Sequence, residues 1–337
     1  MKPMTQSPRH SSSTEPILAE ITDFLHPDLE HVRRLLTEVL DSESAFIREV
    51  GEYICLTRGK MLRPFVTLLS ARAFGHPDGS RSIEIAAALE AIHVATLLHD
   101  DVIDKAALRR GKPSVNARWG DEVAILMADF LFAASFDLAV RSMSPQALQL
   151  LTGVTRSMCE GEMFQLERQA QWLTPDEYLY VISCKTARLF SACTVLGGLS
   201  AGLDPQCLRG LGRFGETFGM AFQITDDALD YEVRDGRWGK PPGIDLAEGK
   251  QTLPLILAYQ AATEQDRARI QQIMNDGRDM AAIADILHRY GSFARCRQLA
   301  DQYARQGADL LTDLRVVDQT AHDHLLSLAR YVVARRY

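Results

Sequence analysis

The segment that most constrains the fold is a long helix-forming stretch that is apolar on nearly every face and then ends in aspartates. Residues 83–104 read IEIAAALEAIHVATLLHDDVID. A helix that is apolar all round is buried inside a large bundle. Several other central segments have the same character. The pattern predicts an all-α protein, a single large helical bundle around a central cavity.

Helix signals recur along the chain, and strand signals are scarce. A capping residue precedes a proline at Ser144-Pro145, Thr174-Pro175 and Asp204-Pro205. Glu177 follows Thr174 by three residues, which is a capping box. The helices are expected at residues 17–25, 28–40, 44–56, 62–74, 80–107, 119–141, 145–170, 175–202, 205–234, 250–262, 264–275, 279–289, 291–313 and 317–335.

Composition bounds the domain organisation. Residues 1–16 are polar and Ser-rich, and they lack the apolar run of a secretory signal, so a disordered tail is expected there. No Pro-, Gly- or Ser-rich linker divides the rest, so residues 17–337 are expected to form one all-helical domain. Of the 337 residues, 46% are hydrophobic, enough for a sizeable core.

Charge and cysteine content narrow the function. The formal net charge of −7 argues against nucleic acid as a partner. Six cysteines without C-x-x-C spacing favour reduced thiols in a cytoplasmic protein rather than zinc or disulfides. The stretch from Val123 to Val140 is long enough to span a membrane. Asp129, Ser135 and Asp137 interrupt it, so we expect a buried central helix and no transmembrane segment.

The motif D-D-x-x-D occurs twice in this helical sequence. In a helix, residues four apart share a face and the next residue flanks it, so each cluster points several negative charges in one direction. Such a cluster is unfavourable unless cations are present. Oxygen ligands of this kind suit Mg²⁺, which is usually held by one or two carboxylates and substrate phosphates. The clusters are Asp100, Asp101 and Asp104, and Asp226, Asp227 and Asp230.

Basic residues accompany the carboxylates. Lys60 and Arg63 lie three apart just before a helix and can converge on one anion. Arg109 and Arg110 follow the first cluster, where the long helix should end, and could serve different phosphate groups. Taken alone, the first pair is by default a solvated basic turn, and the second is equally compatible with cations near a helix C-terminus.

Further polar residues lie near the two clusters. Lys185 and Thr186 are expected in mid-helix. The Gly-rich loop 239–250 does not match the phosphate-binding G-x-x-x-x-G-K-[ST] motif, and we expect it to close over the site and deliver Lys240. His93 lies one heptad before the first cluster, and Gln223 lies one turn before an aspartate of the second.

The order of these motifs resembles the trans-isoprenyl diphosphate synthase (polyprenyl synthetase) family. The series is H-x-x-x-L-L-H-D-D-x-x-D, R-R-G-x-P, K-T, F-Q-I-x-D-D-x-x-D and G-K-x-x-G-x-D-L-x-x-G-K-x-T-L-P. The resemblance runs from about residue 30 to the C-terminal YVVARRY. It implies a Mg²⁺-dependent homodimer that condenses isopentenyl diphosphate with an allylic diphosphate.

The resemblance also assigns roles to residues. About three Mg²⁺ ions per site clamp the allylic diphosphate between the two aspartate clusters, with Asp230 acting through water. Positions that contact that diphosphate are matched by Arg109, Lys185 and Lys240. Positions that bind isopentenyl diphosphate are matched by Lys60, Arg63, His93 and Arg110. Positions whose oxygens face the developing carbocation are matched by Thr186 and Gln223. No dedicated protein base is expected, because the departing diphosphate can take the proton.

Two positions depart from the family pattern. The family usually has Gly-Gly-Lys-Arg before Leu-Arg-Pro, whereas this chain has Arg58 in place of the first Gly and Met61 in place of the Arg. Lys60 and Arg63 are retained, so isopentenyl diphosphate should still bind. The departures concern the conformation of the loop and its affinity for that substrate.

Product length is expected to be set below the first cluster. Short-chain members of the family often carry an aromatic residue one turn before the first aspartate, where this chain has Ala95 and Thr96. Phe132 and Phe136 could form a floor further down. The resemblance to long-chain members implies a product of about C30–C50, centred on octaprenyl.

Four alternatives differ from this interpretation. A short-chain synthase making C15–C20 products differs only in length. A class I terpene cyclase would lack the all-aspartate second cluster and the second substrate site. A non-catalytic partner subunit would usually have lost one cluster, and a structural metal-binding protein leaves the basic residues unexplained.

Overall fold

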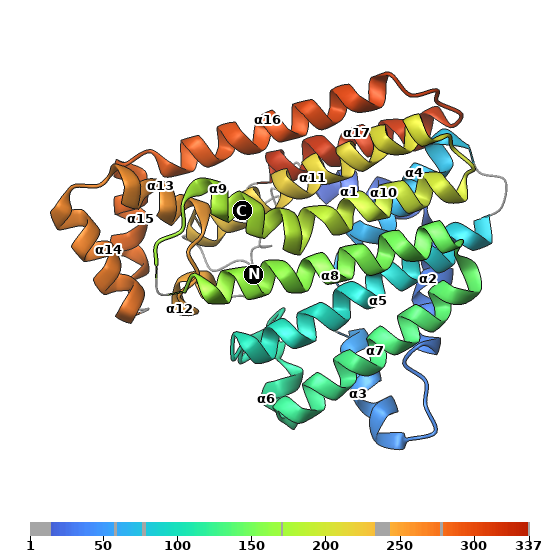
Figure 1. Ribbon diagram of the computed structural model, residues 1–337, viewed down its shortest axis with the longest axis horizontal. Coiled ribbons are helices and arrows are strands. Elements are labelled where there is room, and N and C mark those ends of the chain that lie inside the picture. The colour runs from blue at the N-terminus through green and yellow to red at the C-terminus, as the bar shows by residue number, and fades with distance from the viewer. Residues whose placement is uncertain are drawn as a thin grey trace, which may run out of the picture.

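The computed structural model describes residues 15–56, 59–75, 79–169, 171–232, 243–276 and 279–335. Over these residues the chain is almost entirely helical, which confirms the predicted fold class (Figure 1). The elements are α1 (Glu15–Phe24), α2 (His26–Glu38), α3 (Ala45–Leu56), α4 (Leu62–Phe74), α5 (Gly79–Ile103), β1 (Leu108–Arg109), β2 (Lys112–Pro113), α6 (Val115–Trp119), α7 (Asp121–Ser142), α8 (Pro145–Glu167), α9 (Pro175–Ile182), the π-helical turn η1 (Ser183–Ala187), α10 (Arg188–Ser200), α11 (Pro205–Glu232), α12 (Ile244–Ala247), α13 (Leu253–Ala261), α14 (Glu264–Asp276), α15 (Met280–Arg289), α16 (Ser292–Thr312) and α17 (Gln319–Ala334).

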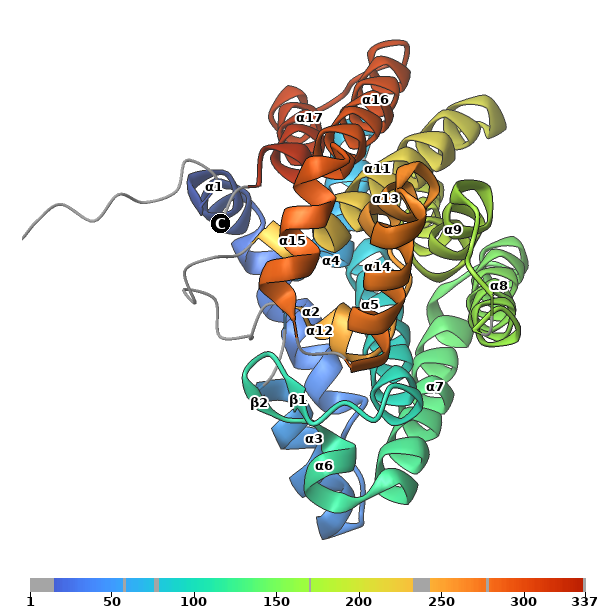
Figure 2. The ribbon, with the colours of Figure 1, turned by 90° about the vertical axis from the view of Figure 1, so that its left-hand side faces the viewer.

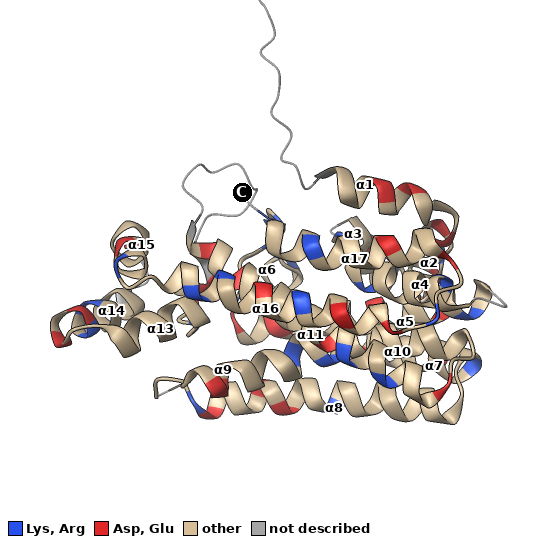
Figure 3. Ribbon diagram, turned by 90° about the horizontal axis from the view of Figure 1, so that it is seen from above, with Lys and Arg blue, Asp and Glu red and all other residues tan. Residues whose placement is uncertain are grey.

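The apolar segment that opened the sequence argument forms α5 near the middle of the bundle. It packs against α2, α4, α7 and α10, and Leu89 and Ile92 are fully buried. A second hydrophobic cluster is formed by α9, α13, α15 and parts of α11 and α16, at the end of the molecule where α14 lies (Figures 1 and 2). The helices α9 to α11 connect the two clusters. On α16, acidic and basic residues are interspersed along the helix (Figure 3).

The predicted caps form as expected. Ser144 Oγ accepts a hydrogen bond from the backbone N–H of Ala147 at 3.2 Å. Thr174 Oγ1 accepts from the N–H of Glu177 at 3.2 Å, and the Glu177 carboxylate accepts from the N–H of Thr174 at 2.8 Å. These bonds satisfy backbone donors that the first turn leaves without helical partners. Most predicted helix boundaries lie within a few residues of the observed ones.

The structure differs from the sequence prediction after the first aspartate cluster. The helix predicted over 80–107 ends at Ile103 and is followed by a small antiparallel hairpin, in which Leu108 pairs with Pro113 and Arg109 with Lys112. Two-residue strands are too short to show a period-2 pattern, so no sequence signal marked them. The hairpin turns Arg109 back toward the end of α5.

The expectation that Val123–Val140 forms a buried helix is wrong. Three helical segments, 79–103, 121–142 and 175–200, are long and apolar enough by composition to cross a membrane. In the most apolar stretch of α7 only 33% of the residues are buried, against 67% in α5. Leu126 and Val140 are 66% and 65% exposed. Hydropathy records what side chains prefer, and it does not show whether this chain supplies a layer to cover them.

The predicted N-terminal tail lies outside the described residues up to residue 14, and α1 begins at Glu15 within it. The domain boundary near residue 17 stays a prediction. Lys240 and Arg58, assigned from the sequence, also lie outside the described residues.

Candidate active site

A cavity of about 1590 Å³ lies between the central helices. It is lined by residues of α4, α5, α7, α8, α9, η1 and α11, and by the segment that follows α12. Most of the site residues expected from sequence reach it. They are Lys60, Arg63, His93, Thr96, Asp100, Asp104, Arg109, Arg110, Phe132, Phe136, Lys185, Thr186, Gln223, Asp226, Asp227 and Asp230. Two expected residues, Asp101 and Ala95, are described but do not line it.

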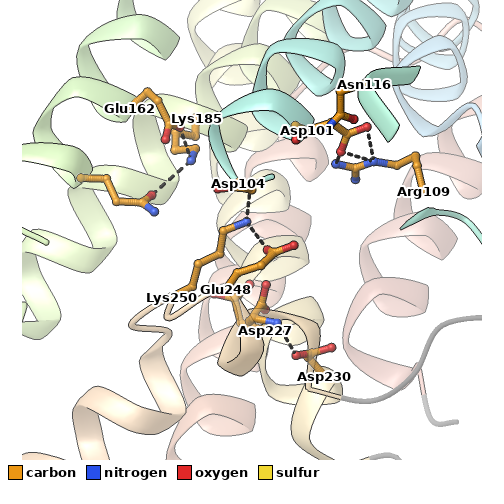
Figure 4. A network of polar contacts seen from close by, with 12 residues as sticks. Asp101, Asp104, Arg109, Asn116, Glu162, Lys185, Asp227, Asp230, Glu248 and Lys250 are labelled. Atoms are coloured by element: carbon orange, nitrogen blue, oxygen red, sulfur yellow. Dashed lines mark hydrogen bonds and ion pairs between the residues drawn. The ribbon is translucent and has the colours of Figure 1, made fainter. Parts of the chain in front are cut away.

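The first aspartate cluster ends α5, and its members have different partners (Figure 4). Asp101 is 2% exposed and accepts hydrogen bonds from Arg109 Nε at 2.9 and 3.2 Å. Asp104 lies at the mouth, where Lys250 Nζ donates to its carboxylate at 2.5 Å. Lys250 Nζ also lies 2.9 Å from the carboxylate of Glu248. The chain therefore already supplies a cation to two of the three carboxylates.

The second cluster lies in the last third of α11. The guanidinium of Arg335, just beyond α17, forms an ion pair with Asp226 and also donates to the carbonyl oxygen of Phe222 at 3.1 Å. Its carbon lies 4.5 Å from the centre of the Phe222 ring. Asp230 accepts at its carboxylate from the backbone N–H of Asp245 at 3.1 Å. The C-terminal helix and the segment after α11 thus both reach this cluster.

Asp227 is held differently, by neutral donors. The Tyr178 hydroxyl donates to Asp227 Oδ2 at 2.6 Å, and the Gln223 amide donates to Oδ1 at 2.7 Å. The Thr186 hydroxyl in turn donates to the Gln223 oxygen at 2.9 Å. Tyr178 and Asp227 are 3% and 6% exposed. A continuous hydrogen-bond chain therefore links α9, η1 and α11 at the site.

The π-helical turn η1 presents Lys185 and Thr186 to the cavity. Its neighbour α8 approaches closely at Gly161, where a Cβ atom would lie 2.6 Å from Cys184 Cβ. Lys185 Nζ forms an ion pair with Glu162 and donates to the Gln165 side-chain oxygen at 3.1 Å (Figure 4). π-Helical turns are rare and frequently found at functional sites.

Burial shifts the titration of these groups. Loss of hydration raises the pKa of Asp100 to about 6, against the attraction of Lys185. Burial likewise raises the pKa of Asp227 to about 6, and the hydrogen bonds from Tyr178 and Gln223 limit the rise. For Lys250, burial lowers the pKa, but Asp104 and Glu248 outweigh it and leave the pKa above its usual value. Both aspartates are therefore mostly ionised at neutral pH.

Basic residues assigned to the second substrate line the same cavity, and together they form a basic pocket. Arg63 is 9% exposed, and its guanidinium carbon lies 4.7 Å from the centre of the Phe190 ring. Burial and the nearby charges of Arg63 and Arg110 lower the pKa of His93 well below its usual value, so its imidazole is neutral. Lys60 Nζ donates to the Tyr331 hydroxyl at 3.1 Å. The four residues assigned to the second substrate thus share one wall of the cavity.

The donor atoms fit hard divalent cations, because the clusters offer only carboxylate oxygens. Among the residues that the structure describes, no group of three or more His, Cys, Asp or Glu side chains converges to hold a metal ion. Asp101, turned into its ion pair with Arg109 and away from the cavity lining, is the least accessible of the six.

The lower part of the cavity contains three of the four residues expected to set product length. Thr96 on α5 and Phe132 and Phe136 on α7 line it. Ala95 is fully buried and is not among the lining residues, and its role in product length stays a prediction. Neighbouring helical positions differ by about 100° around the axis, so only one of the two small residues could face the cavity.

Sequence reasoning missed several residues at the site. Lys250 lies in the G-K-x-T-L-P motif and Arg335 in YVVARRY, so both were quoted in the resemblance without a role. Tyr178 and Glu162 carried no local signal, because their partners are contributed by other helices. Glu90, which is 5% exposed and also lines the cavity, was missed as well.

The comparisons with known proteins agree with this geometry. The polyprenyl synthetase family model matches residues 44–290. Octaprenyl diphosphate synthase of Escherichia coli is 34% identical over 94% of this chain and 99% of that protein. A short chain isoprenyl diphosphate synthase of Methanothermobacter thermautotrophicus is 33% identical over 95% of this chain and 100% of that protein.

A solved structure also matches the whole fold. The polyprenyl synthase of Caulobacter crescentus, complexed with calcium and isoprenyl diphosphate, superimposes with a TM-score of 0.89 at 35% identity. The match covers 98% of this chain and 100% of that one. With the family model matching well over half of the sequence, the chain belongs to the polyprenyl synthetase family.

Proposed function

We propose that the protein is a Mg²⁺-dependent trans-prenyltransferase that condenses isopentenyl diphosphate with an allylic diphosphate to make a long-chain polyprenyl diphosphate. The observation that carries the proposal is one cavity that is lined both by members of the two aspartate clusters and by the basic pocket. Two diphosphates require two such anion sites. Apolar residues such as Leu97, Phe132 and Phe136 also line the cavity and would contact the growing chain.

The allylic diphosphate is assigned to the space between the clusters. About three Mg²⁺ ions, held there by Asp100, Asp104 and Asp226 together with the diphosphate, would neutralise the leaving group as its carbon–oxygen bond breaks. Lys185 and Arg109 line the same space and add fixed positive charge. Asp227 keeps Gln223 in place through the 2.7 Å hydrogen bond.

The second substrate is assigned to the basic pocket. Arg63 and Arg110 can each donate several N–H bonds to one diphosphate, and the neutral imidazole of His93 adds a donor without further charge. Thr186 and Gln223 line the cavity between the two assigned positions, where their oxygens would face the allylic cation. The proton lost after the new bond forms goes to the departing diphosphate, so no protein base is required.

The test is direct. The purified single chain is incubated with farnesyl diphosphate, radiolabelled isopentenyl diphosphate and Mg²⁺, and the dephosphorylated products are chromatographed. We expect products of about C30–C50, centred on octaprenyl. Products that stop at C15 or C20 would identify a short-chain synthase. Cyclic hydrocarbons made without isopentenyl diphosphate would identify a cyclase, and no turnover by the single chain would identify a subunit that needs a partner. Asp226→Asn is the inactive control.

We also propose that two copies of the chain associate through α7. Ile125, Leu126 and Val140 of this helix are 40%, 66% and 65% exposed, and exposed apolar patches often mark protein–protein contacts. Light scattering after gel filtration should give twice the mass of the chain, 37.6 kDa. Leu126→Lys should produce a monomer, whereas Leu56→Lys, at a 71% exposed site on α3, should not. The six free cysteines favour a cytoplasmic location.

A further inference from the structure

Three consecutive residues between α12 and α13 contact three different parts of the bundle. Lys250 Nζ donates at 2.5 Å to Asp104, just beyond the end of α5. The Thr252 hydroxyl donates at 3.1 Å to the Tyr231 hydroxyl on α11. Gln251, which lies between them, contacts the connection between α8 and α9. Gln251 has no part in the reaction proposed above.

Both polar atoms of the Gln251 side chain take part in that contact. Its oxygen accepts a hydrogen bond from the backbone N–H of Leu173 at 2.7 Å. Its amide nitrogen donates to the backbone carbonyl oxygen of Gln171 at 2.8 Å. The side-chain amide therefore pairs with the backbone in both directions, and a side chain of the same length without polar atoms could make neither bond.

The connection between α8 and α9 is itself held in place. Trp172, between the two residues that Gln251 contacts, stacks on Tyr259 of α13, with the ring centres 3.8 Å apart and the planes inclined by 9°. Leu173 is 8% exposed and belongs to the second hydrophobic cluster. Thr174 then caps α9. Gln251 is thus bonded to a part of the chain that has few conformations available to it.

The neighbour of Gln251 in the chain is Lys250, a side chain that is costly to fix. A lysine loses more rotamer freedom than most residues when it is held in one position. The ammonium of Lys250 lies between Asp104 and Glu248, although the side chain is 26% exposed. The backbone N–H of Lys250 donates to the carbonyl oxygen of Asp245 at 2.8 Å, which holds the chain on one side. Gln251 holds it on the other side.

We propose that Gln251 is a positioning residue that holds Lys250 on Asp104, through its two hydrogen bonds to the α8–α9 connection. The consequence for substrate rests on the proposed function. With its ammonium in place, Lys250 offsets the negative charge of Asp104 and Glu248 beside the space assigned to the allylic diphosphate. Once released, it would leave these carboxylates to repel that anion. Binding of isopentenyl diphosphate should not change, because the basic pocket does not include Lys250.

The first experiment asks whether Gln251 holds Lys250, and it needs no substrate. The metal-free protein is treated briefly with acetic anhydride, and mass spectrometry compares acetylation of Lys250 with that of the exposed Lys105. Gln251→Met removes both hydrogen bonds with little change in volume and should speed acetylation of Lys250 about tenfold. Gln272→Met is the matched control, because Gln272 accepts a hydrogen bond from Arg269 at 3.0 Å outside the cavity lining. An unchanged rate in Gln251→Met overturns the proposal.

The second experiment measures the consequence for each substrate. KM values for farnesyl and isopentenyl diphosphates are determined at saturating Mg²⁺ for Gln251→Met, Lys250→Met and the double variant. Gln251→Met should raise KM for farnesyl diphosphate about tenfold and leave KM for isopentenyl diphosphate unchanged. In the Lys250→Met background it should have no further effect, because it acts through Lys250.

A tenfold rise that persists in the Lys250→Met background contradicts the proposal, since Gln251 would then act on the substrate site independently of Lys250. An equal rise in both KM values also contradicts it, because a general disturbance of the fold would account for the change. If the wild type makes no product, the proposed function fails. The acetylation rates alone then decide whether Gln251 positions Lys250.

Discussion

The buried hydrogen bond from Tyr178 to Asp227 leads to a quantitative prediction. Tyr178→Phe removes a hydroxyl that donates at 2.6 Å to a carboxylate that is only 6% exposed. A hydrogen bond to a charged group contributes about 1.5–3 kcal/mol. Taking about 2 kcal/mol for the charged form alone, the substitution should raise the pKa of Asp227 from about 6 to about 7.5, since one pKa unit corresponds to about 1.4 kcal/mol.

The sign of the pH dependence follows from the raised pKa. In the wild type, Asp227 contributes stability that is present at low pH and is lost as the pH rises from its unfolded value through about 6. In Tyr178→Phe the neutral form of Asp227 is unaffected, whereas its ionised form loses a hydrogen bond and becomes less favourable. The loss of unfolding free energy should therefore be close to zero at pH 5, about 1.2 kcal/mol at pH 7 and about 2 kcal/mol at pH 9.

Urea denaturation at these three pH values measures the loss. Tyr180→Phe is the control, because Tyr180 lies two residues away on the same helix and is 41% exposed. A loss that is equal at pH 5 and pH 9 would refute the reasoning, because the hydroxyl would then be acting on something other than the charge of Asp227.

Three more predictions concern metal and close packing. Chelation of divalent ions should abolish incorporation of isopentenyl diphosphate, and Mg²⁺ should restore it in the same sample. Gly59→Ala would push a Cβ into the Arg110 guanidinium and should raise KM for isopentenyl diphosphate about tenfold, the equivalent of one hydrogen bond, with kcat nearly unchanged in initial-rate assays. Gly161→Ala would crowd Cys184 on η1 and should lower the urea-unfolding free energy by about 1–3 kcal/mol. Gly153→Ala on the same helix, with no atom within 4 Å of the added methyl, should stabilise by up to about 1 kcal/mol.

Local sequence patterns were enough to predict most of the helices and the region of the site. The caps at Ser144 and Thr174 act within four residues, so they can be read directly from the chain. Asp100 and Asp104, and likewise Asp226 and Asp230, share a helix face for the same reason. These features depend only on residues that are close together in one helix, and the spacing of residues in the sequence determines which of them are neighbours.

Contacts between distant segments could not be predicted in this way. Tyr178 lies 49 residues from Asp227, and Arg335 lies 109 residues from Asp226. Nothing near either residue indicates its partner. The error at α7 has a related cause, because exposure depends on which other helices cover a face. The position of Ala95 depended on the rotation of α5, which packing decides to within one residue.

The π-helical turn has a consequence for the phase of the helix that contains it. Residues Pro175 to Ser200 form one continuous rod that crosses the boundary between the two hydrophobic clusters. Tyr178 and Ile182 belong to one cluster, and Leu189 and Cys193 belong to the other. A π-helical turn accommodates one extra residue, which rotates everything after it by about 100° relative to an unbroken α-helix.

That rotation lets a single helix present two differently oriented apolar stripes. Deleting one residue from η1 would restore a regular α-helix, but the stripe of α10 would then turn away from its cluster, or Lys185 and Thr186 would turn away from the cavity. The extra residue in η1 therefore sets how far α10 is rotated about the helix axis relative to α9. With this rotation, one continuous helix can direct Lys185 and Thr186 into the cavity and still pack its apolar residues into both hydrophobic clusters.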